Sequence, residues 1–277
     1  MDDIRVAAAI TNAPLNNIAH NIDSIRNWAA AAREKGAAII CFPELNISGY
    51  STKEEIKASA QILPGPVSDE LIQIASDNQI IILAGVTEKN AAGRIFASHL
   101  AVSPGKLLGI YRKVHIAPPE QTLFTSGGAV PLFQVQNVQF GIQLCYDAHF
   151  PELSTRMATD GADIIFMPHA SPRGKPSAKF NSWMRHLTAR AYDNGVFIVA
   201  CNQTGENGNG LNFPGLAVVI EPSGHILKKL LIDQEALLVA DLKGDALSYV
   251  RDHRMRYFLP NRRPEIYFSQ KDSKEDD

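Results

Sequence analysis

Hydrophobic and polar residues alternate strictly in one stretch near the middle of the chain. From Val138 to Cys145 an apolar residue occupies every second position, and Phe150-Pro151-Glu152 follow shortly afterwards. The alternation predicts a strand, and the Pro and Glu are typical of the first turn of a helix. Cys145 therefore lies at a predicted strand-to-helix turn, where backbone N–H groups and a helix dipole favour a thiolate. Taken alone, a free cysteine is more often a small packed side chain.

The remaining pattern divides the chain into alternating strands and helices. Apolar spacings of three and four residues predict helices, and short apolar runs between turn residues predict strands. The predicted helices include residues 17–35, a short helix around residues 53–60, a segment capped by Ser68-Asp69-Glu70, the helix after the cysteine to about residue 160, and residues 179–194 and 245–254. The predicted strands include residues 4–10, 37–41, 80–86, 106–112, 163–167, 196–201, 216–220, 226–232 and 236–241. Hairpins interrupt the parallel pattern twice, so we expect mixed sheets with helices on their outer faces.

Length and composition favour one large soluble domain. The chain has 277 residues, 45% of them hydrophobic, and contains no linker-like stretch. The formal net charge is −2 with scattered Lys and Arg, which gives no reason to expect nucleic acid or a membrane surface as a partner. No apolar run approaches the roughly 20 residues of a membrane span. We expect one domain over residues 1–268 and a flexible acidic tail over residues 269–277.

The cysteines and histidines narrow the expected location and cofactor chemistry. Cys41, Cys145 and Cys201 are far apart and odd in number, which argues against a disulfide framework and against a cysteine-rich zinc site. The first residues lack the basic start and cleavage site of a signal peptide, so we expect a cytoplasmic protein. No HxH, HExxH or CxxC element is present, and no metal site is expected.

Three reactive side chains follow predicted strands. Glu44, Lys113 and Cys145 each lie just past a strand's C-terminal end, the edge that active sites of α/β folds favour. A carboxylate can take a thiol proton, and the thiolate can attack a carbonyl or nitrile carbon. A lysine ammonium, together with the N–H of Tyr146, can hold the developing oxyanion. Spacing alone leaves open whether the three converge, and a lone Glu or Lys is usually solvated.

Three separated blocks resemble the catalytic blocks of the nitrilase, or carbon–nitrogen hydrolase, superfamily. They are Phe42-Pro43-Glu44 with Ser48-Gly49-Tyr50, Tyr111-Arg112-Lys113-Val114-His115, and Cys145-Tyr146-Asp147 with Phe150-Pro151-Glu152. Their order is also the family's order, and the resemblance covers nearly the whole chain. It implies an α/β fold, a four-layer α-β-β-α sandwich with two mixed β-sheets. It also implies at least a homodimer and no cofactor.

The resemblance gives roles to individual residues. Glu44 is then the general base, Lys113 the oxyanion-stabilising cation and Cys145 the nucleophile. Glu120 fits a second glutamate that positions or assists the substrate, and the alternative is a solvated loop carboxylate. Further candidates for substrate binding follow apolar strands, or lie near the cysteine or after Met167: Tyr50, Tyr146, His149, His169, Arg173, Trp183 and Asn202. For Trp183, packing of the helix without any contact to substrate is a strong alternative. For His149, an equally good alternative is a histidine at the start of a helix whose ring is satisfied by hydrogen bonds.

The function that the resemblance implies belongs to the amidase or N-carbamoyl amidase-like branch. A thiol hydrolase of this kind would cleave a non-peptide C–N bond of a small linear amide or N-carbamoyl compound through a cysteine thioester, releasing ammonia or an amine. A nitrilase shares the same three residues and is the nearest alternative. A catalytically silent member that uses the fold for binding or assembly is the third, although the intact trio weighs against it.

Overall fold

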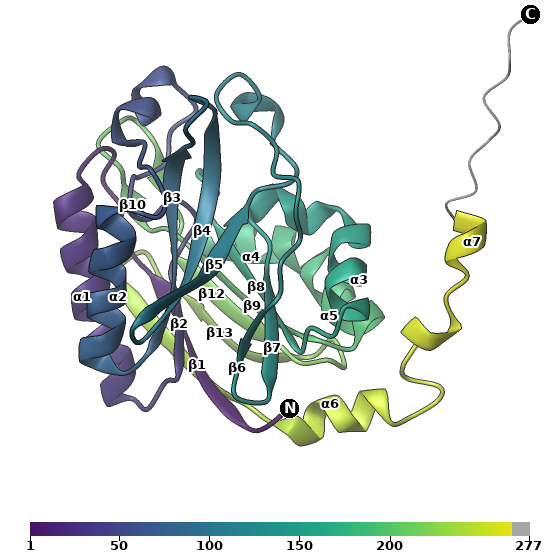
Figure 1. The fold of residues 1–277 in the computed structure, drawn as a ribbon. Helices are drawn as coiled ribbons and strands as arrows, with labels where there is room; N and C mark the ends of the chain where they lie inside the picture. Colours follow the sequence, from purple (N-terminus) through teal and green to yellow (C-terminus); the bar gives the residue numbers. More distant parts are fainter. Residues whose placement is uncertain (268–277) are drawn as a thin grey trace, which may run out of the picture.

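Two six-stranded sheets pack face to face, with helices on their outer sides (Figure 1). The computed structural model describes residues 1–267. One hydrophobic core lies between the sheets and extends to the helices of the second sheet, and another lies between the first sheet and its helices. This arrangement confirms the predicted four-layer sandwich. The predicted domain boundary at residue 268 and the predicted tail over residues 269–277 lie outside the described residues.

The first sheet has the order β14-β1-β2-β3-β4-β5. Its strands are β1 (Ile4–Ile10), β2 (Ile39–Cys41), β3 (Ile81–Lys89), β4 (Ile95–Ser103), β5 (Lys106–Arg112) and β14 (Ala236–Leu242). The neighbours β1, β2 and β3 are parallel, and the remaining pairs are antiparallel. The parallel strands are covered on both faces, which explains their continuous apolar sequences.

The second sheet follows a similar plan, in the order β13-β12-β9-β8-β7-β6. Its strands are β6 (Phe133–Val135), β7 (Val138–Ile142), β8 (Ile164–His169), β9 (Phe197–Asn202), β12 (Leu216–Ile220) and β13 (Ile226–Leu231). The strands β7, β8 and β9 are parallel, and the pairs outside them are antiparallel. The glycine-rich segment before β12 contains a small hairpin of β10 (Gly205–Glu206) and β11 (Asn212–Phe213).

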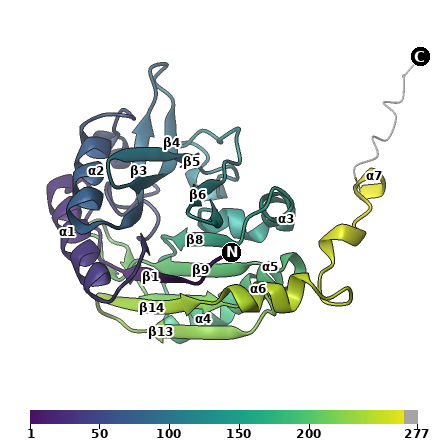
Figure 2. The same cartoon turned by 60° about the horizontal axis from the view of Figure 1, so that its bottom comes forward.

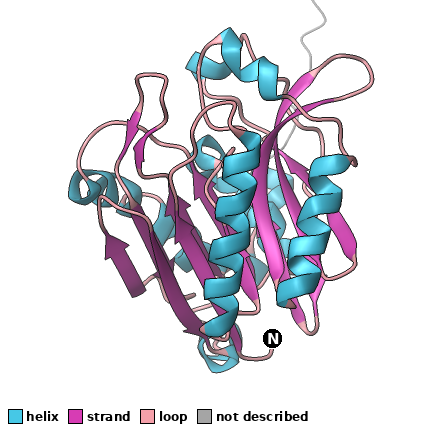
Figure 3. Ribbon diagram, turned by 90° about the vertical axis from the view of Figure 1, so that its left-hand side faces the viewer, coloured by secondary structure: helices cyan, strands magenta, loops and turns pink. Residues whose placement is uncertain are grey.

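The first five α-helices form the outer layers, and the last two lie toward the end of the chain. The α-helices are α1 (Ile18–Glu34), α2 (Pro66–Asn78), α3 (Pro151–Thr159), α4 (Pro176–Met184), α5 (Leu187–Asn194), α6 (Gly244–Arg251) and α7 (Pro264–Tyr267). Short 3₁₀ helices are η1 (Glu54–Ser59), η2 (Pro118–Glu120), η3 (Cys145–His149) and η4 (Leu259–Asn261). Helices α1 and α2 lie side by side against the first sheet (Figure 3). Within residues 1–267, no helix combines the length and the apolar character needed to cross a membrane.

The C-terminal arm begins after α6 and leads away from the body of the molecule (Figure 2). Over its described part the arm contains the short helices η4 and α7. Several of its large apolar side chains are exposed, including Met255, Phe258, Ile266 and Tyr267. An exposed group of apolar side chains is typical of an interaction surface.

The prediction of one helix over residues 179–194 is wrong. Helix α4 ends at Met184 and α5 starts at Leu187, because the N–H groups of Arg185 and His186 bond to carbonyls only three residues back. Such i→i+3 bonds tighten the last turn and end the helix. The apolar spacing continues through Trp183 and Leu187, so periodicity could not reveal the break.

Two other predicted boundaries differ from the structure. Helix α2 begins at Pro66, and Ser68 lies inside its first turn, where the hydroxyl accepts a hydrogen bond from the Gly65 N–H at 2.8 Å. The strand predicted to reach Cys145 ends at Ile142, although the next residues stay extended. The cysteine instead begins η3, so the chain turns more sharply than alternation alone indicates.

Candidate active site

Three charged side chains form one buried, hydrogen-bonded group where the strand ends of the two sheets meet. The Nζ of Lys113 donates to Glu44 Oε1 at 2.8 Å and to Glu120 Oε2 at 2.7 Å. The exposed fractions of Glu44, Lys113 and Glu120 are 0%, 1% and 3%. Buried charges are costly unless they are paired and hydrogen-bonded, and here one ammonium serves two carboxylates. Glu44 follows β2 and Lys113 follows β5, as the sequence predicted.

A tight turn after β2 fixes Glu44. The next residue, Leu45, has a φ of +54°, and its backbone passes so close to Gly85 that a Cβ there would collide with the Leu45 nitrogen. The Ala170 N–H donates to Glu44 Oε2 at 3.1 Å, and the Gln203 side chain donates to the Glu44 carbonyl at 2.9 Å. The first sheet fixes the backbone of this turn through the close approach of Leu45 to Gly85. Segments that follow strands of the second sheet hold the backbone and the carboxylate of Glu44.

A buried carboxylate anchors the turn that carries the cysteine. Cys145 has a φ of +44°, a left-handed conformation that is uncommon for a residue with a side chain. Asp147 Oδ2 accepts from the Leu144 N–H at 3.0 Å and from the Tyr111 hydroxyl at 2.7 Å. Its Oδ1 accepts from the His115 N–H at 2.8 Å. These bonds tie the turn to the end of β5, close to Lys113.

The electrostatics couple the cysteine to the charged group. Burial raises the pKa of the Cys145 thiol, and the negative charge of Glu44 adds to this rise while Lys113 opposes it. Burial also raises the pKa of Glu44 to about 7, again with Lys113 opposing. The pKa of Lys113 is lowered by burial, but the charges of the two carboxylates reverse this and raise it overall. Near neutral pH the site thus combines a protonated thiol, a carboxylate able to accept its proton, and a permanent cation.

Several of the predicted substrate-binding residues surround this group. Tyr50 is buried, and its hydroxyl donates to Glu120 Oε1 at 2.8 Å. His169 and Trp183 are also buried, and their rings lie 4.0 Å apart between centroids. Tyr146 directly follows the cysteine and is partly exposed. Glu120 is thus a buried partner of the lysine and the tyrosine, not a solvated loop carboxylate.

Three other candidates lie differently. The amide of Asn202 bonds the Ser171 backbone on both sides, accepting at 2.8 Å and donating at 3.1 Å, so this residue positions a loop. The side chain of Arg173 is exposed. His149 is exposed as well, and its ring lies 4.4 Å from that of His186. These two side chains lie at the surface, in contrast to the buried charged group.

Some residues of the site received no role from the sequence. Asp147 was part of a recognised block, but three of its four hydrogen-bond partners are atoms of Tyr111 and His115, which lie more than 30 positions earlier and leave no local pattern around Asp147. Arg190 donates to the carbonyls of Ala148 and His149 at 3.1 and 3.2 Å, and thereby supports η3 from α5. Within residues 1–267, no group of three or more His, Cys, Asp or Glu side chains could hold a metal ion.

Comparison with known proteins gives consistent matches along the chain. The sequence model of the carbon-nitrogen hydrolase family matches residues 5–252. A nitrilase of Pyrococcus abyssi is 28% identical over 96% of this chain and 99% of its own. An N-carbamoylputrescine amidase of Solanum lycopersicum is 29% identical over 94% of this chain and 92% of its own.

Solved structures agree with these sequence matches. A mutant of the amidase from Nesterenkonia sp. AN1, with acrylamide added to its active-site cysteine, superposes with a TM-score of 0.82. It is 29% identical, and the match covers 95% of this chain and 98% of that one. The matches to the family model, to the sequence relatives and to the solved structure each cover most of this chain. The residues matched by the family model include Glu44, Lys113 and Cys145. This chain belongs to the carbon–nitrogen hydrolase family.

Proposed function

We propose that the protein hydrolyses the C–N bond of a small linear amide or N-carbamoyl compound through a thioester on Cys145. The observation that carries this proposal is the buried group of Glu44, Lys113 and Glu120 beside the turn that presents the thiol. Amidases among the relatives and solved structures support it. A structural role alone would not favour two buried carboxylates around one lysine, because such charges are costly to desolvate.

In the first half-reaction, the carboxylate of Glu44 takes the thiol proton as Cys145 Sγ attacks the amide carbon. The carbonyl oxygen becomes an oxyanion, which the Lys113 ammonium and the Tyr146 N–H stabilise. The C–N bond then breaks, and Glu44 returns its proton to the departing nitrogen. The products are ammonia or an amine and an acyl group bound to Sγ as a thioester.

In the second half-reaction, Glu44 takes a proton from water as the water oxygen attacks the thioester carbon. The same donors hold the second oxyanion, the C–S bond breaks, and the proton passes to Sγ to restore the thiol. Glu120 acts mainly by fixing the position of Lys113, and Tyr50 fixes Glu120 in turn through its 2.8 Å hydrogen bond. The cycle needs only water and the groups named.

A nitrilase activity is the second candidate, because the relative from Pyrococcus abyssi carries that name. The same nucleophile, base and cation serve attack on a nitrile carbon. A panel of amides, N-carbamoyl compounds and nitriles, assayed for ammonia release, separates the two functions. Activity on nitriles alone would replace the amidase proposal, and no ammonia from any compound would favour a silent binding or assembly member.

Substitution of the nucleophile tests the mechanism. We expect Cys145→Ser to lower kcat by about a thousand-fold or more, because the serine hydroxyl is a far weaker nucleophile without a matched base. Cys201→Ala is the matched control, since Cys201 is buried in β9 and has no part in the reaction. Circular dichroism checks that both variants fold. Wild-type turnover by folded Cys145→Ser would show that the nucleophile is wrongly assigned.

We also propose a cytoplasmic location and a homodimer. The three thiols are free, which suits a reducing compartment. Cell fractionation tests the location, and recovery in an oxidising compartment would contradict it. The dimer is proposed from the exposed apolar side chains of the C-terminal arm.

A further inference from the structure

Lys179 on α4 brings a second ammonium group to the loop that follows β8, next to the residue that holds Glu44. Its Nζ donates to Ser171 Oγ at 2.8 Å and to the Pro172 carbonyl at 3.0 Å. Ser171 directly follows Ala170, whose N–H holds the carboxylate of Glu44. The lysine side chain is only partly exposed. The ammonium is therefore anchored to the segment that positions the proposed base.

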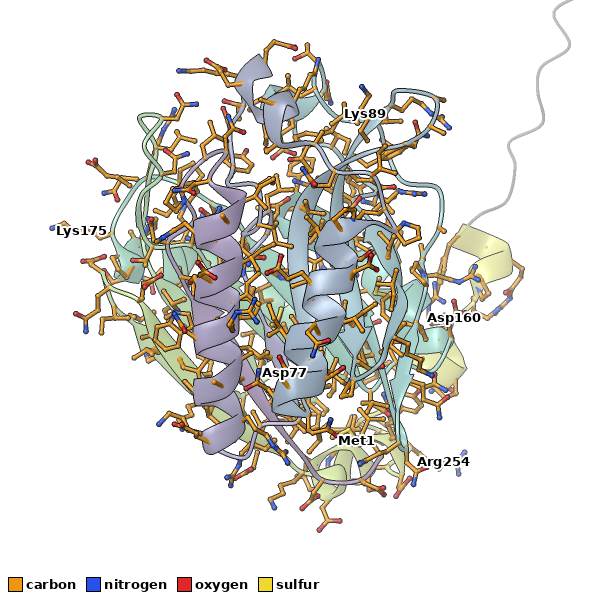
Figure 4. All side chains as sticks on the ribbon, turned by 60° about the vertical axis from the view of Figure 1, so that its left-hand side comes forward. Met1, Asp77, Lys89, Asp160, Lys175 and Arg254 are labelled. Carbon is orange, nitrogen blue, oxygen red and sulfur yellow. The ribbon has the colours of Figure 1, made fainter. Side chains whose placement is uncertain are left out.

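The orientation of α4 directs Lys179 inward. Lys179 and Trp183 are four residues apart, so they share one face of the helix. Trp183 is buried against His169, and Lys179 bonds the loop that follows His169, so this face of α4 packs on the segment after β8. Lys175, at the start of the same helix, is exposed and is labelled at the edge of the molecule in Figure 4.

The charge of Lys179 is not neutralised within the described part of the chain. Its two hydrogen-bond partners among residues 1–267 are neutral oxygens, which leaves one N–H of the ammonium for a ligand. Burial lowers the pKa of Lys179, and the charge of the Cys145 thiolate opposes that change. Lys179 is not among the largest influences on the pKa of the thiol, which include Glu44 and Lys113. Ala170 and Ser171 are consecutive, so the anchor of Lys179 lies next to the residue that holds Glu44, and Lys179 is a cation near the charged group but outside its hydrogen bonds.

We infer that Lys179 binds a carboxylate on the substrate, so that the preferred compounds carry an anionic group remote from the scissile C–N bond. The inference rests on the proposed function and names its substrate class. A carboxylate would complete the hydrogen bonding of the ammonium and neutralise its charge, and charge-assisted bonds of this kind are stronger than neutral ones. Monoamides of dicarboxylic acids and N-carbamoyl amino acids both have this chemistry.

Two matched substrate pairs test the inference. Glutaramate is compared with pentanamide, and N-carbamoyl-β-alanine with propylurea, so that each pair differs by a carboxylate in place of a methyl group. We expect the wild-type kcat/KM to be about ten- to a hundred-fold higher for the acid than for the neutral compound in at least one pair. The pair that shows this preference tells whether the substrate is a monoamide of a dicarboxylic acid or an N-carbamoyl amino acid. Lys179→Met should remove this preference, and the readout is the ratio of kcat/KM for the acid to kcat/KM for the neutral compound, because loss of the bonds to Ser171 and Pro172 affects both compounds alike.

Further variants separate recognition from a structural role. Lys179→Glu should shift the preference toward 5-aminopentanamide, which carries an ammonium at the remote end. Lys175→Met, the matched control at the N-cap of the same helix, should keep the wild-type preference. If Lys179→Met lowers both members of a pair equally, or if wild type favours the neutral member of both pairs, the inference fails and the proposed function stands. If wild type releases no ammonia from any compound, the proposed function fails and the inference with it.

Discussion

The protonation of Glu44 links the proposed chemistry to the surrounding charges. Burial raises its pKa to about 7, Lys113 opposes that rise, and the negative charge of Glu120 adds to it. The mechanism requires Glu44 as the carboxylate when it accepts the thiol proton. Activity should therefore be lost as pH falls through the pKa of this group and should level off above it.

A pH profile tests this coupling. We expect kcat/KM for a neutral amide to fall about tenfold per pH unit on the acid side of an apparent pKa near 7. Glu120→Gln removes a negative neighbour, which favours the ionised form of Glu44, so the acid limb should move to lower pH although kcat also falls. Glu54→Gln, at an exposed position in η1, should leave the limb in place. A limb that moves to higher pH in Glu120→Gln would contradict the assigned coupling.

Residue identities were easier to predict than residue environments. Glu44, Lys113 and Cys145 could be selected because each follows an apolar strand, and active sites favour that edge of the sheet. The burial of Glu120 could not be predicted, because it depends on Tyr50, which lies 70 positions earlier in the chain. The contacts of Lys179 could not be predicted either, because its hydrogen-bond partners lie in a loop whose path the apolar pattern does not determine.

At the level of elements, the turn η3 decides where the thiol lies. Asp147 accepts hydrogen bonds from backbone and side-chain donors with both oxygens. An asparagine would present an NH₂ group to some of these donors. We expect Asp147→Asn to lower the free energy of unfolding by about 2–4 kcal/mol and to slow alkylation of Cys145.

Urea denaturation and iodoacetamide labelling measure these two effects. Tyr111→Phe is the matched control, because it removes one donor to Asp147 and leaves the backbone bonds in place; it should cost about 1 kcal/mol. The same stability and labelling rate in Asp147→Asn and wild type would show that Asp147 does not anchor the turn.

Most elements followed from the apolar pattern, and the exceptions have identifiable causes. The strands β1, β5 and β12 were predicted with their observed bounds, because each is an apolar run or alternation between turn residues. The break between α4 and α5 was missed because apolar spacing continues across it. The short strand β6 was not predicted, and its Phe133–Val135 segment is too brief to show a period.

For the whole molecule, the C-terminal arm bears on assembly. Met255 is 79% exposed, Ile266 56% and Tyr267 59%. We expect the protein to elute at about twice the 30.3 kDa of one chain, because pairing would cover these side chains. The double variant Met255→Asp, Ile266→Asp should shift the protein to the monomer in size-exclusion chromatography with light scattering.

Ile62→Asp is the control for that measurement, because Ile62 is 67% exposed but lies far from the arm in sequence, between η1 and α2. It should leave the dimer intact. A wild-type monomer at every concentration would contradict the proposed assembly.

The layered architecture was predictable, but the meeting of the two sheets at one site was not. Alternating helices and strands with two hairpin interruptions indicated mixed sheets, and the family resemblance supplied the sandwich. Each half of the candidate active site comes from a different sheet: Glu44 and Lys113 follow the first, and Cys145 follows the second. Periodicity within each strand carries no information about how two sheets stack.

The central claim is that Cys145 carries the acyl group during turnover. Acid quenching of the enzyme during hydrolysis of a neutral amide, followed by peptide mass spectrometry, tests it directly. We expect the acyl mass on the peptide that contains Cys145, none on those with Cys41 or Cys201, and no adduct in Cys145→Ala. Ammonia release by folded Cys145→Ala, or an acyl group on another residue, would contradict it.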